Sequence, residues 1–325
     1  MRTFKKLLPF LVGLIAFLCI NSLLNFLFVP YQFTRVKIHK IETESFDDLI
    51  LGSSHGSSAM DPDVISGHTG RSCFNAAAGG QFPCDNYYLL LDAMREHAPG
   101  RVILEYDPSY FVVRDGFNRN ARYQLHEMAM SGVKARYFLD QFFPGDIRYV
   151  LMPWSLYSLE KSAMENNIRR KTSDIYRSYS VEPFIDSAQA CGENGFVAIA
   201  DESSGERSTP ELFFSESNSR AVEENRKYFE KILQFLNESG IEAVVVMTPV
   251  PDSTRDKNEA FYLKAHEMMT GLAGRYGAKY LDFVVPDEGD SFRGMSWDDE
   301  LFSDGEGHMR VSTARSFSGL LGSLI

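Results

Sequence analysis

The chain has 325 residues, of which 44% are hydrophobic, 13% aromatic and 24% charged, and this composition excludes a disordered, collagen-like or multi-span membrane protein. Four cysteines are too few for a small disulfide-stapled scaffold. The net charge of −11 argues against nucleic acid as a main partner, because phosphate binding requires a basic surface. This charge is unevenly divided, since residues 1–40 carry six basic groups and no acid, whereas residues 41–325 carry a net −17.

The first element that the sequence predicts is a membrane-spanning helix. Leu7 to Val29 is almost continuously apolar over 23 positions, and at about 1.5 Å per residue this length crosses a hydrocarbon core of about 30 Å. Arg2, Lys5 and Lys6 precede the run, and the positive-inside rule places them in the cytoplasm. We therefore expect a single-pass protein of the cell membrane, with a cytoplasmic N-terminus and an extracytoplasmic main domain.

Two other interpretations of this segment are less favoured. A cleaved signal peptide has an apolar region of about 7–15 residues followed by a small-residue cleavage site, whereas this run is longer and ends in Phe28-Val29-Pro30. A buried helix of a soluble protein is disfavoured by the length and the basic flank. Asn21 and Asn25 share one helical face, and they either bond to a partner helix in the membrane or, as we prefer, lie near its outer interface.

Beyond residue 40, β-branched runs alternate with amphipathic helical patterns, which predicts an α/β fold with a doubly wound, mostly parallel sheet. Continuously apolar runs such as Ala243–Val246 are expected of strands covered on both faces. The expected strands are Leu49–Ser53, Cys73–Ala76, Arg101–Tyr106, Ile241–Thr248 and Lys279–Val284. The expected helix faces are Tyr87, Leu90, Leu91 and Met94; Phe229, Ile232, Leu233 and Leu236; Phe261, Ala265, Met268 and Leu272; and Ala314, Phe317, Leu321 and Leu324.

The alternation fails between Phe111 and Arg220, a stretch rich in Tyr, Phe, Arg and Asn. We interpret the region at about 111–220 as an insertion that is helical, lies beside the C-terminal edge of the sheet and forms part of the substrate surface. The predicted organisation is a cytoplasmic stub, transmembrane anchor and linker over residues 1–40, followed by one extracytoplasmic α/β domain over residues 41–325.

The sharpest chemical feature is a serine directly after the first expected strand, in Leu51-Gly52-Ser53-Ser54-His55. In an open parallel sheet, active sites form at the C-terminal ends of the strands. A serine there can present its hydroxyl while a following helix supplies backbone N–H groups. Taken alone, Gly-Ser-Ser is equally compatible with an ordinary loop.

Two further motifs accompany this serine. Asp304-Gly305-Glu306-Gly307-His308 precedes the last helix, and a carboxylate with a histidine is what a nucleophilic serine needs. Asn75 and Gly80 follow the second strand, where a glycine lets a backbone N–H approach an oxyanion closely. A solvated acidic loop and a plain turn explain these motifs individually, but their order along the chain joins them to the serine.

This order, Gly-x-Ser, then Asn-x4-Gly, then Asp…His before the C-terminal helix, resembles the SGNH/GDSL hydrolase superfamily. The resemblance covers about 49–110 and 241–325 and implies an SGNH-hydrolase-like, flavodoxin-like fold. It implies that Ser54 is the nucleophile, that Ser54 and Gly80 provide oxyanion N–H donors, and that Asp304 and His308 complete the catalytic set.

The sequence departs from that family in two places. The usual spacing is Asp-x-x-His, so Glu306 is an alternative to Asp304 as the partner of His308. No Asn follows the third strand to act as a third oxyanion donor, since the chain reads Glu105-Tyr106-Asp107. These departures and the anchor resemble the membrane-anchored branch of the DltD type, whose members are associated with membrane-bound O-acyltransferases.

Three smaller points concern the surroundings of these motifs. His55 is either a second proton acceptor or a helix-start residue, and we favour the latter. Cys73 and Cys84 flank the Gly80 loop and could form a disulfide in an oxidising exterior. No His/Cys/Asp group has metal-ligand spacing and no glycine-rich phosphate loop is present, so we predict neither a metal nor a cofactor.

The sequence thus predicts a membrane-anchored serine esterase or O-acyltransferase that acts on acyl groups of cell-envelope polysaccharide or teichoic acid. Its expected partners are a glycan or polyol polymer, the membrane through residues 7–29, and a membrane-bound O-acyltransferase. The alternative is a catalytically degenerate SGNH-fold scaffold or polymer-binding partner of such an acyltransferase. The acyl donor, the acceptor, the choice between transfer and hydrolysis, and the oligomeric state are left open.

Overall fold

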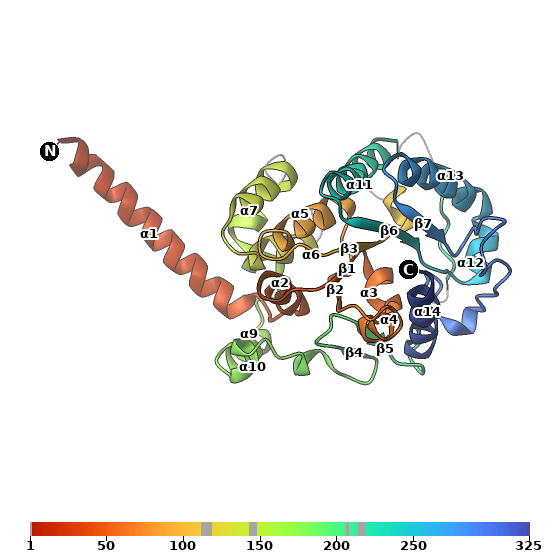
Figure 1. Ribbon diagram of the computed structural model, residues 1–325. Coiled ribbons are helices and arrows are strands. Elements are labelled where there is room, and N and C mark those ends of the chain that lie inside the picture. The colour runs from red at the N-terminus through yellow and green to blue at the C-terminus, as the bar shows by residue number, and fades with distance from the viewer. Residues whose placement is uncertain (1, 112–118, 143–147, 206–207, 214–218) are drawn as a thin grey trace.

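A computed structural model describes residues 2–111, 119–142, 148–205, 208–213 and 219–325. The described part is built around a five-stranded sheet whose order is β2-β1-β3-β6-β7, with each neighbouring pair parallel (Figure 1). This is the 2-1-3-4-5 order of one class of doubly wound α/β folds. The strands are β1 (Asp48–Leu51), β2 (Cys73–Asn75), β3 (Arg101–Glu105), β6 (Glu242–Met247) and β7 (Lys279–Asp282).

The five predicted strands are confirmed, and their burial explains why the sequence could predict them. Alternate residues of β1 point to opposite faces, so that Leu49 and Leu51 join one hydrophobic cluster and Ile50 the other. Both faces are covered by helices, and Leu49, Ile50 and Leu51 are at most 2% exposed. A strand buried on both sides reads as a continuous apolar run because neither face requires polar residues.

The four predicted helix faces also pack as expected. On one face of the sheet lie α2 (Phe33–Thr43), α5 (Pro83–Ala93), α11 (Ser219–Glu238) and α13 (Glu259–Arg275). The opposite cluster is formed with α4 (Pro62–Thr69) and α14 (Val311–Leu324). Two short helices lie at strand ends, α3 (Ser54–Ala59) after β1 and α12 (Asp252–Lys257) after β6.

The helix α2 extends the domain beyond the predicted boundary at residue 40. Val36, Ile38 and Ile41 are at most 2% exposed, and the last two belong to the cluster on the α5 face. Residues 33–40, which the sequence assigned to a linker, are therefore part of the folded α/β body.

The region between β3 and β6 is only partly the helical insertion that the sequence predicts. It contains an antiparallel pair of short strands, β4 (Gln189–Cys191) and β5 (Val197–Ile199), which were not foreseen because they lack a clear period-2 pattern. The β4–β5 turn reaches the end of β2, where the Asn75 N–H donates to Asn194 O over 3.0 Å. The described helices are α6 (Arg119–Glu127), α7 (Gly132–Tyr137), α8 (Arg148–Leu151), α9 (Lys161–Lys171) and α10 (Asp174–Arg177). Short 3₁₀ and π turns complete it: η1 (Pro108–Phe111), η2 (Phe138–Phe142), η3 (Pro153–Leu156) and η4 (Glu182–Phe184).

The helix α1 (Arg2–Phe28) projects from the body (Figure 1). Its stretch Leu8–Phe28 is 21 residues long with a mean hydropathy of 2.2. The described side chains from Leu8 to Ile20 are exposed. By length and composition α1 can cross a membrane, as the sequence predicted, although a signal sequence would satisfy the same criterion.

At the opposite edge of the sheet from the strand C-termini, a buried ion pair joins two strands. Asp48 begins β1 with a fully buried side chain, and its Oδ2 lies 2.5 Å from Nη2 of Arg101, which begins β3. Arg71 Nε approaches the other carboxylate oxygen at 2.7 Å. Because both Asp48 and Arg101 are desolvated, each depends on the other for charge compensation.

We predict that Asp48→Ala lowers the free energy of unfolding by about 3–5 kcal/mol, because Arg101 would stay buried without its carboxylate. Thermal unfolding of the purified full chain in detergent measures this loss. The control is Asp256→Ala, whose side chain is 69% exposed beside Arg255 and whose removal should cost about 0–1 kcal/mol. Equal shifts for the two variants would contradict the prediction.

Candidate active site

Ser54 lies where the sequence placed it, at the turn between β1 and α3. Gly52 and Ser53 link the strand to the helix, and Ser53 caps α3 by accepting a hydrogen bond on Oγ from the His55 N–H at 3.3 Å. Ser54 is then the first residue of α3, at the C-terminal edge of the parallel sheet. Its hydroxyl faces a cavity rather than the core.

His308 reaches this serine from the loop before α14. Its Nε2 lies 2.8 Å from Ser54 Oγ, although the two residues are 254 positions apart in the chain. The His308 ring is half-buried, and its Nδ1 lies 2.7 Å from Asp304 Oδ2. A continuous chain of hydrogen bonds therefore runs from the Ser54 hydroxyl through the imidazole to a carboxylate.

Asp304 is held rigidly enough to orient the ring. Its second oxygen, Oδ1, accepts hydrogen bonds from the backbone N–H groups of Glu306, Gly307 and His308 at 3.0–3.2 Å. Gly307 has φ +116°, a conformation that favours glycine, and this tight loop is what lets the longer Asp-x-x-x-His spacing still join the two side chains. Of the two acids that the sequence left open, Asp304 contacts His308 Nδ1.

The protonation of this pair follows from its contacts. Partial burial raises the pKa of Asp304, but the hydrogen bond and charge of His308, with the loop N–H groups, outweigh it and hold the pKa at about 2. Burial lowers the pKa of His308, yet the Asp304 carboxylate outweighs that effect and raises it above its ordinary value. An anionic Asp304 and a more basic His308 suit an imidazole that accepts a proton from serine.

A cavity of about 340 Å³ opens beside Ser54. Gly80, the other predicted site residue, lines it together with Ser54, and φ +71° at Gly80 requires glycine. Pro210 and Leu212 of the insertion also line the cavity, so part of the insertion lies beside the C-terminal edge of the sheet, as predicted.

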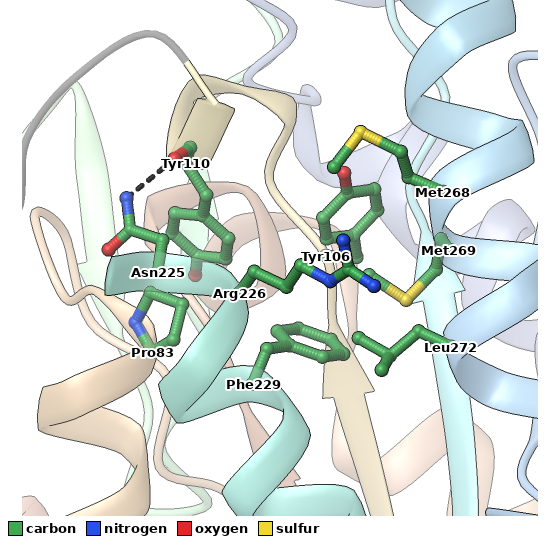
Figure 2. Close-up of a pocket in the computed structure, with 9 residues that line it drawn as sticks. All are labelled: Pro83, Tyr106, Tyr110, Asn225, Arg226, Phe229, Met268, Met269 and Leu272. Atoms are coloured by element: carbon green, nitrogen blue, oxygen red, sulfur yellow. Dashed lines mark hydrogen bonds between the residues drawn. The ribbon is translucent and has the colours of Figure 1, made fainter. Parts of the chain in front are cut away.

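One wall of the cavity is supported from the core. Tyr110 lines the cavity and also an internal void of about 10 Å³ between α11 and α13 (Figure 2). Asn225 of α11 donates from Nδ2 to the Tyr110 carbonyl at 2.5 Å, as the dashed line in Figure 2 marks. The void is of single-water size, and we therefore treat it as packing rather than as a ligand site.

His55 lies at the start of α3, as the sequence predicted, and it also contacts two residues of the site. It is 9% exposed, its Nδ1 lies 3.5 Å from Asp107 Oδ2, and its ring centroid lies 4.8 Å from that of His308. Burial lowers the pKa of His55, and the nearby His308 adds to this effect while Asp107 opposes it. The sequence favoured the plainer interpretation because it could not place Asp107 beside His55.

Glu105, at the end of β3, supports the serine turn from beneath. Its carboxyl is fully buried, and Oε2 accepts the Ser53 N–H at 2.6 Å. Gly52 and Gly56 make room for it, since a Cβ atom at either position would lie 2.6 or 2.9 Å from Glu105 Cβ. Burial, reinforced by the Asp107 carboxylate, raises the pKa of Glu105 to about 8. Glu105 therefore carries a proton at neutral pH.

His55, Glu105 and Asp107 each place a possible ligand atom within 4.8 Å of the others, and all three are buried. One imidazole and two carboxyl groups are a donor set that divalent cations accept once Glu105 loses its proton. The sequence could not suggest this group, because its members lie at the ends of two different strands. His55 comes after β1, whereas Glu105 and Asp107 lie at the end of β3 and just after it. The sequence offered one sign of this group, the charged residue Glu105 at the end of the apolar run Val102-Ile103-Leu104.

The possible disulfide between Cys73 and Cys84 is not formed, and both side chains are buried. Cys73 on β2 packs into the cluster on the α14 face, whereas Cys84 on α5 packs into the cluster on the opposite face. The sheet therefore separates the two side chains, which proximity in sequence could not reveal.

We predict that Glu105→Ala lowers both stability and Ser54 reactivity, because it opens a cavity beneath the turn and leaves the Ser53 N–H without its acceptor. Glu105→Gln retains the size and an oxygen acceptor and should behave nearly as wild type at pH 5. Thermal unfolding and labelling by an activated-ester probe measure the two effects. Equal behaviour of the Ala and Gln variants would contradict this role.

The raised pKa of Glu105 also predicts how the stability of the protein depends on pH. In the unfolded chain Glu105 titrates near 4.5, while in the folded chain its pKa is about 8, so the folded state holds a proton that the unfolded state releases. The stability of the wild type should therefore fall, relative to Glu105→Gln, as the pH rises from 5 to 8. A difference in unfolding temperature that stays constant over this range would show that Glu105 is not the titrating group.

Neither a scan against protein-family models nor a search of the curated proteins gives a match to this chain. What can be said of its function therefore depends on the geometry at the C-terminal edge of its sheet.

Proposed function

We propose that the protein is a serine acyl-ester hydrolase or O-acyltransferase of the SGNH/GDSL type, anchored in the membrane by α1. Its substrates in this proposal are acyl groups on a cell-envelope polysaccharide or teichoic acid, handled outside the membrane. The observation that carries the proposal is the hydrogen-bonded series from Ser54 Oγ through His308 to Asp304, with distances of 2.8 and 2.7 Å.

In the proposed mechanism, Ser54 attacks the acyl carbonyl and His308 Nε2 accepts the hydroxyl proton. Asp304 keeps His308 in the tautomer that carries its proton on Nδ1 and stabilises the imidazolium that forms. His308 then donates the proton to the leaving alcohol, which releases it and leaves an acyl group on Ser54. A second alcohol or water, deprotonated by His308, attacks this ester and restores the serine.

The negative charge that develops on the carbonyl oxygen must be stabilised by hydrogen-bond donors. The N–H of Ser54, at the start of α3, and that of Gly80, on the same cavity, are the proposed pair. Losing one such donor costs about 10²–10³ in rate in comparable sites. Asp107, which contacts His55 of α3, follows β3 at the place where the family has an Asn donor, so the third position differs from the family pattern.

The alternative of a degenerate scaffold was motivated by that missing Asn and by the altered acid spacing. The altered acid spacing no longer supports the scaffold alternative, because Asp304 Oδ2 lies 2.7 Å from His308 Nδ1 despite the extra residue. A scaffold would have no need for a half-buried serine, imidazole and carboxylate in one hydrogen-bonded series. We therefore place the catalytic proposal first.

We predict that a fluorophosphonate probe labels the purified full chain and that Ser54→Ala abolishes the labelling, because only Ser54 is hydrogen-bonded to His308 Nε2 among the described serines. The matched control is Ser53→Ala, which removes the α3 cap at a cost of about 1 kcal/mol but keeps the nucleophile. Identical labelling of wild type and Ser54→Ala would refute the mechanism.

We predict that Asp304→Asn reduces the labelling rate by about 10³–10⁴, as expected when the carboxylate that orients a catalytic imidazole is lost. In the wild type the rate should rise with pH as His308 loses its proton, and the variant should shift that rise to lower pH because Asp304 is what raises the pKa of His308. The control Glu306→Gln should leave the rate within about threefold of wild type, since its side chain lacks this contact. A larger loss in Glu306→Gln than in Asp304→Asn would assign the role to Glu306.

A further inference from the structure

The insertion between β3 and β6 packs against the last two turns of α1. Asn21 Nδ2 donates to Leu151 O at 2.7 Å, and Trp154 Nε1 donates to Asn21 Oδ1 at 2.9 Å. The Trp154 backbone N–H donates to Asn25 Oδ1 at 3.1 Å. Asn21 and Asn25 therefore find partners within this chain. An unpaired amide in an apolar medium costs about 2–7 kcal/mol, so these contacts allow Asn21 and Asn25 to lie at a depth where water is scarce.

The end of α1 is held in the same way. Asn167 Nδ2 donates to Leu27 O at 3.0 Å, and Lys171 Nζ donates to the carbonyls of Asn25 and Phe26 at 2.9 and 2.8 Å. Helix C-terminal carbonyls lack partners within the helix. The insertion supplies these partners, which fixes it at the outer end of α1.

The candidate membrane span of α1 includes the turns on which the insertion packs. By length and composition this span runs from Leu8 to Phe28, which at about 1.5 Å per residue gives about 30 Å, the thickness of a hydrocarbon core. If α1 crosses a membrane over this stretch, the turns from Asn21 to Phe28 form the outer end of the span. The insertion residues packed on those turns then lie at the membrane surface or just below it.

The surface beside these contacts is apolar. We define the α7–α8 platform as residues 122–139 and 150–159; with α9, it lies on the side of the body from which α1 projects (Figure 1). Its large exposed apolar side chains are Met130 at 88%, Leu139 at 54%, Leu151 at 48% and Leu159 at 56%. Between them opens a pocket of about 540 Å³, lined by Leu125, Phe138 and Val150 and rimmed by Arg122, His126 and Lys134.

The charge of this region differs from that of the rest of the outer domain. Residues 119–177 contain ten basic and six acidic residues, a net +4, whereas residues 41–325 as a whole carry −17. A basic region beside exposed apolar side chains and a tryptophan has the composition that a membrane with anionic headgroups attracts.

We propose that the α7–α8 platform rests in the outer surface of the bilayer and that its pocket takes an acyl chain of an anionic phospholipid. The apolar lining holds the chain, and Arg122 and Lys134 at the rim provide positive charge for the phosphate. This contact is continuous with the α1 anchor and does not depend on acyl chemistry at Ser54, so its failure would leave the proposed function untouched.

The first test uses the two tryptophans of the chain. The full-length protein is reconstituted into bilayers whose lipids carry bromine on the upper part of the acyl chains, and bromine quenches tryptophan at short range. Trp297→Phe leaves Trp154 alone, and we expect its emission to fall at least about twofold relative to plain lipid, as for an interfacial tryptophan. Trp154→Phe leaves Trp297, which packs against Phe317 of α14, as the matched control that should not be quenched. Unquenched Trp154 emission would overturn the proposed depth.

The second test addresses the pocket. Phosphatidylglycerol with a photoactivatable group in its acyl chain is cross-linked to the full chain in bilayers. Ala135→Trp fills the pocket and should reduce cross-linking within the platform at least about fivefold. The control is Ala129→Trp, an exposed position nearby that does not line the pocket. Equal cross-linking of the two variants would overturn the bound acyl chain and leave only general lipid contact.

Discussion

The hydrogen bond between His308 and Ser54 depends on how α14 docks against α4. The Asp61 N–H, at the cap of α4, donates to Ser318 Oγ at 2.7 Å, and Arg315 Nε approaches the Asp61 carboxylate at 3.2 Å. Gly322 allows close packing, since a Cβ there would lie 2.8 Å from His68 Cβ. The loop before α14 is thereby set against the turn after β1, and the 254-residue separation of Ser54 and His308 is closed by helix packing.

Two histidines lie side by side in this site, and their surroundings separate their roles. His308 is hydrogen-bonded to the anionic Asp304, which raises the pKa of His308, whereas burial lowers the pKa of His55 even though Asp107 lies 3.5 Å away. Two imidazolium ions with ring centroids 4.8 Å apart would repel each other. Keeping His55 neutral therefore makes it easier for His308 to hold a proton during a reaction. Opposite shifts in neighbouring groups are the pattern by which acid–base roles are assigned.

The sequence predicts the sheet well and the surroundings of the site poorly, for physical reasons. The sequence predicts the strands at Val102–Leu104 and Ala243–Val246 because both faces of each strand are buried. It predicts Ser54, Asp304 and His308 as site residues because they occur in order at or after the ends of strands. The cluster of His55, Glu105 and Asp107 is different, since it exists only because β1 and β3 are neighbours in the sheet. The β4–β5 pair and the short helices lack a sustained period, and tertiary contacts rather than local pattern determine them.

The position of the site relative to α1 is fixed by α2. This helix packs on the sheet through Ile38 and Ile41, and its Lys37 side chain is 3% exposed, with Nζ donating to the Ala77 carbonyl and lying 3.4 Å from Ser57 Oγ. Burial lowers the pKa of Lys37 to about 7. Ala77 lies three residues before Gly80, so a helix that follows the anchor contacts the loop that lines the cavity. A flexible linker would let the cavity sample many heights above a membrane, whereas a packed α2 holds it at one. If α1 is embedded, the substrate must therefore come to a fixed position near the membrane surface.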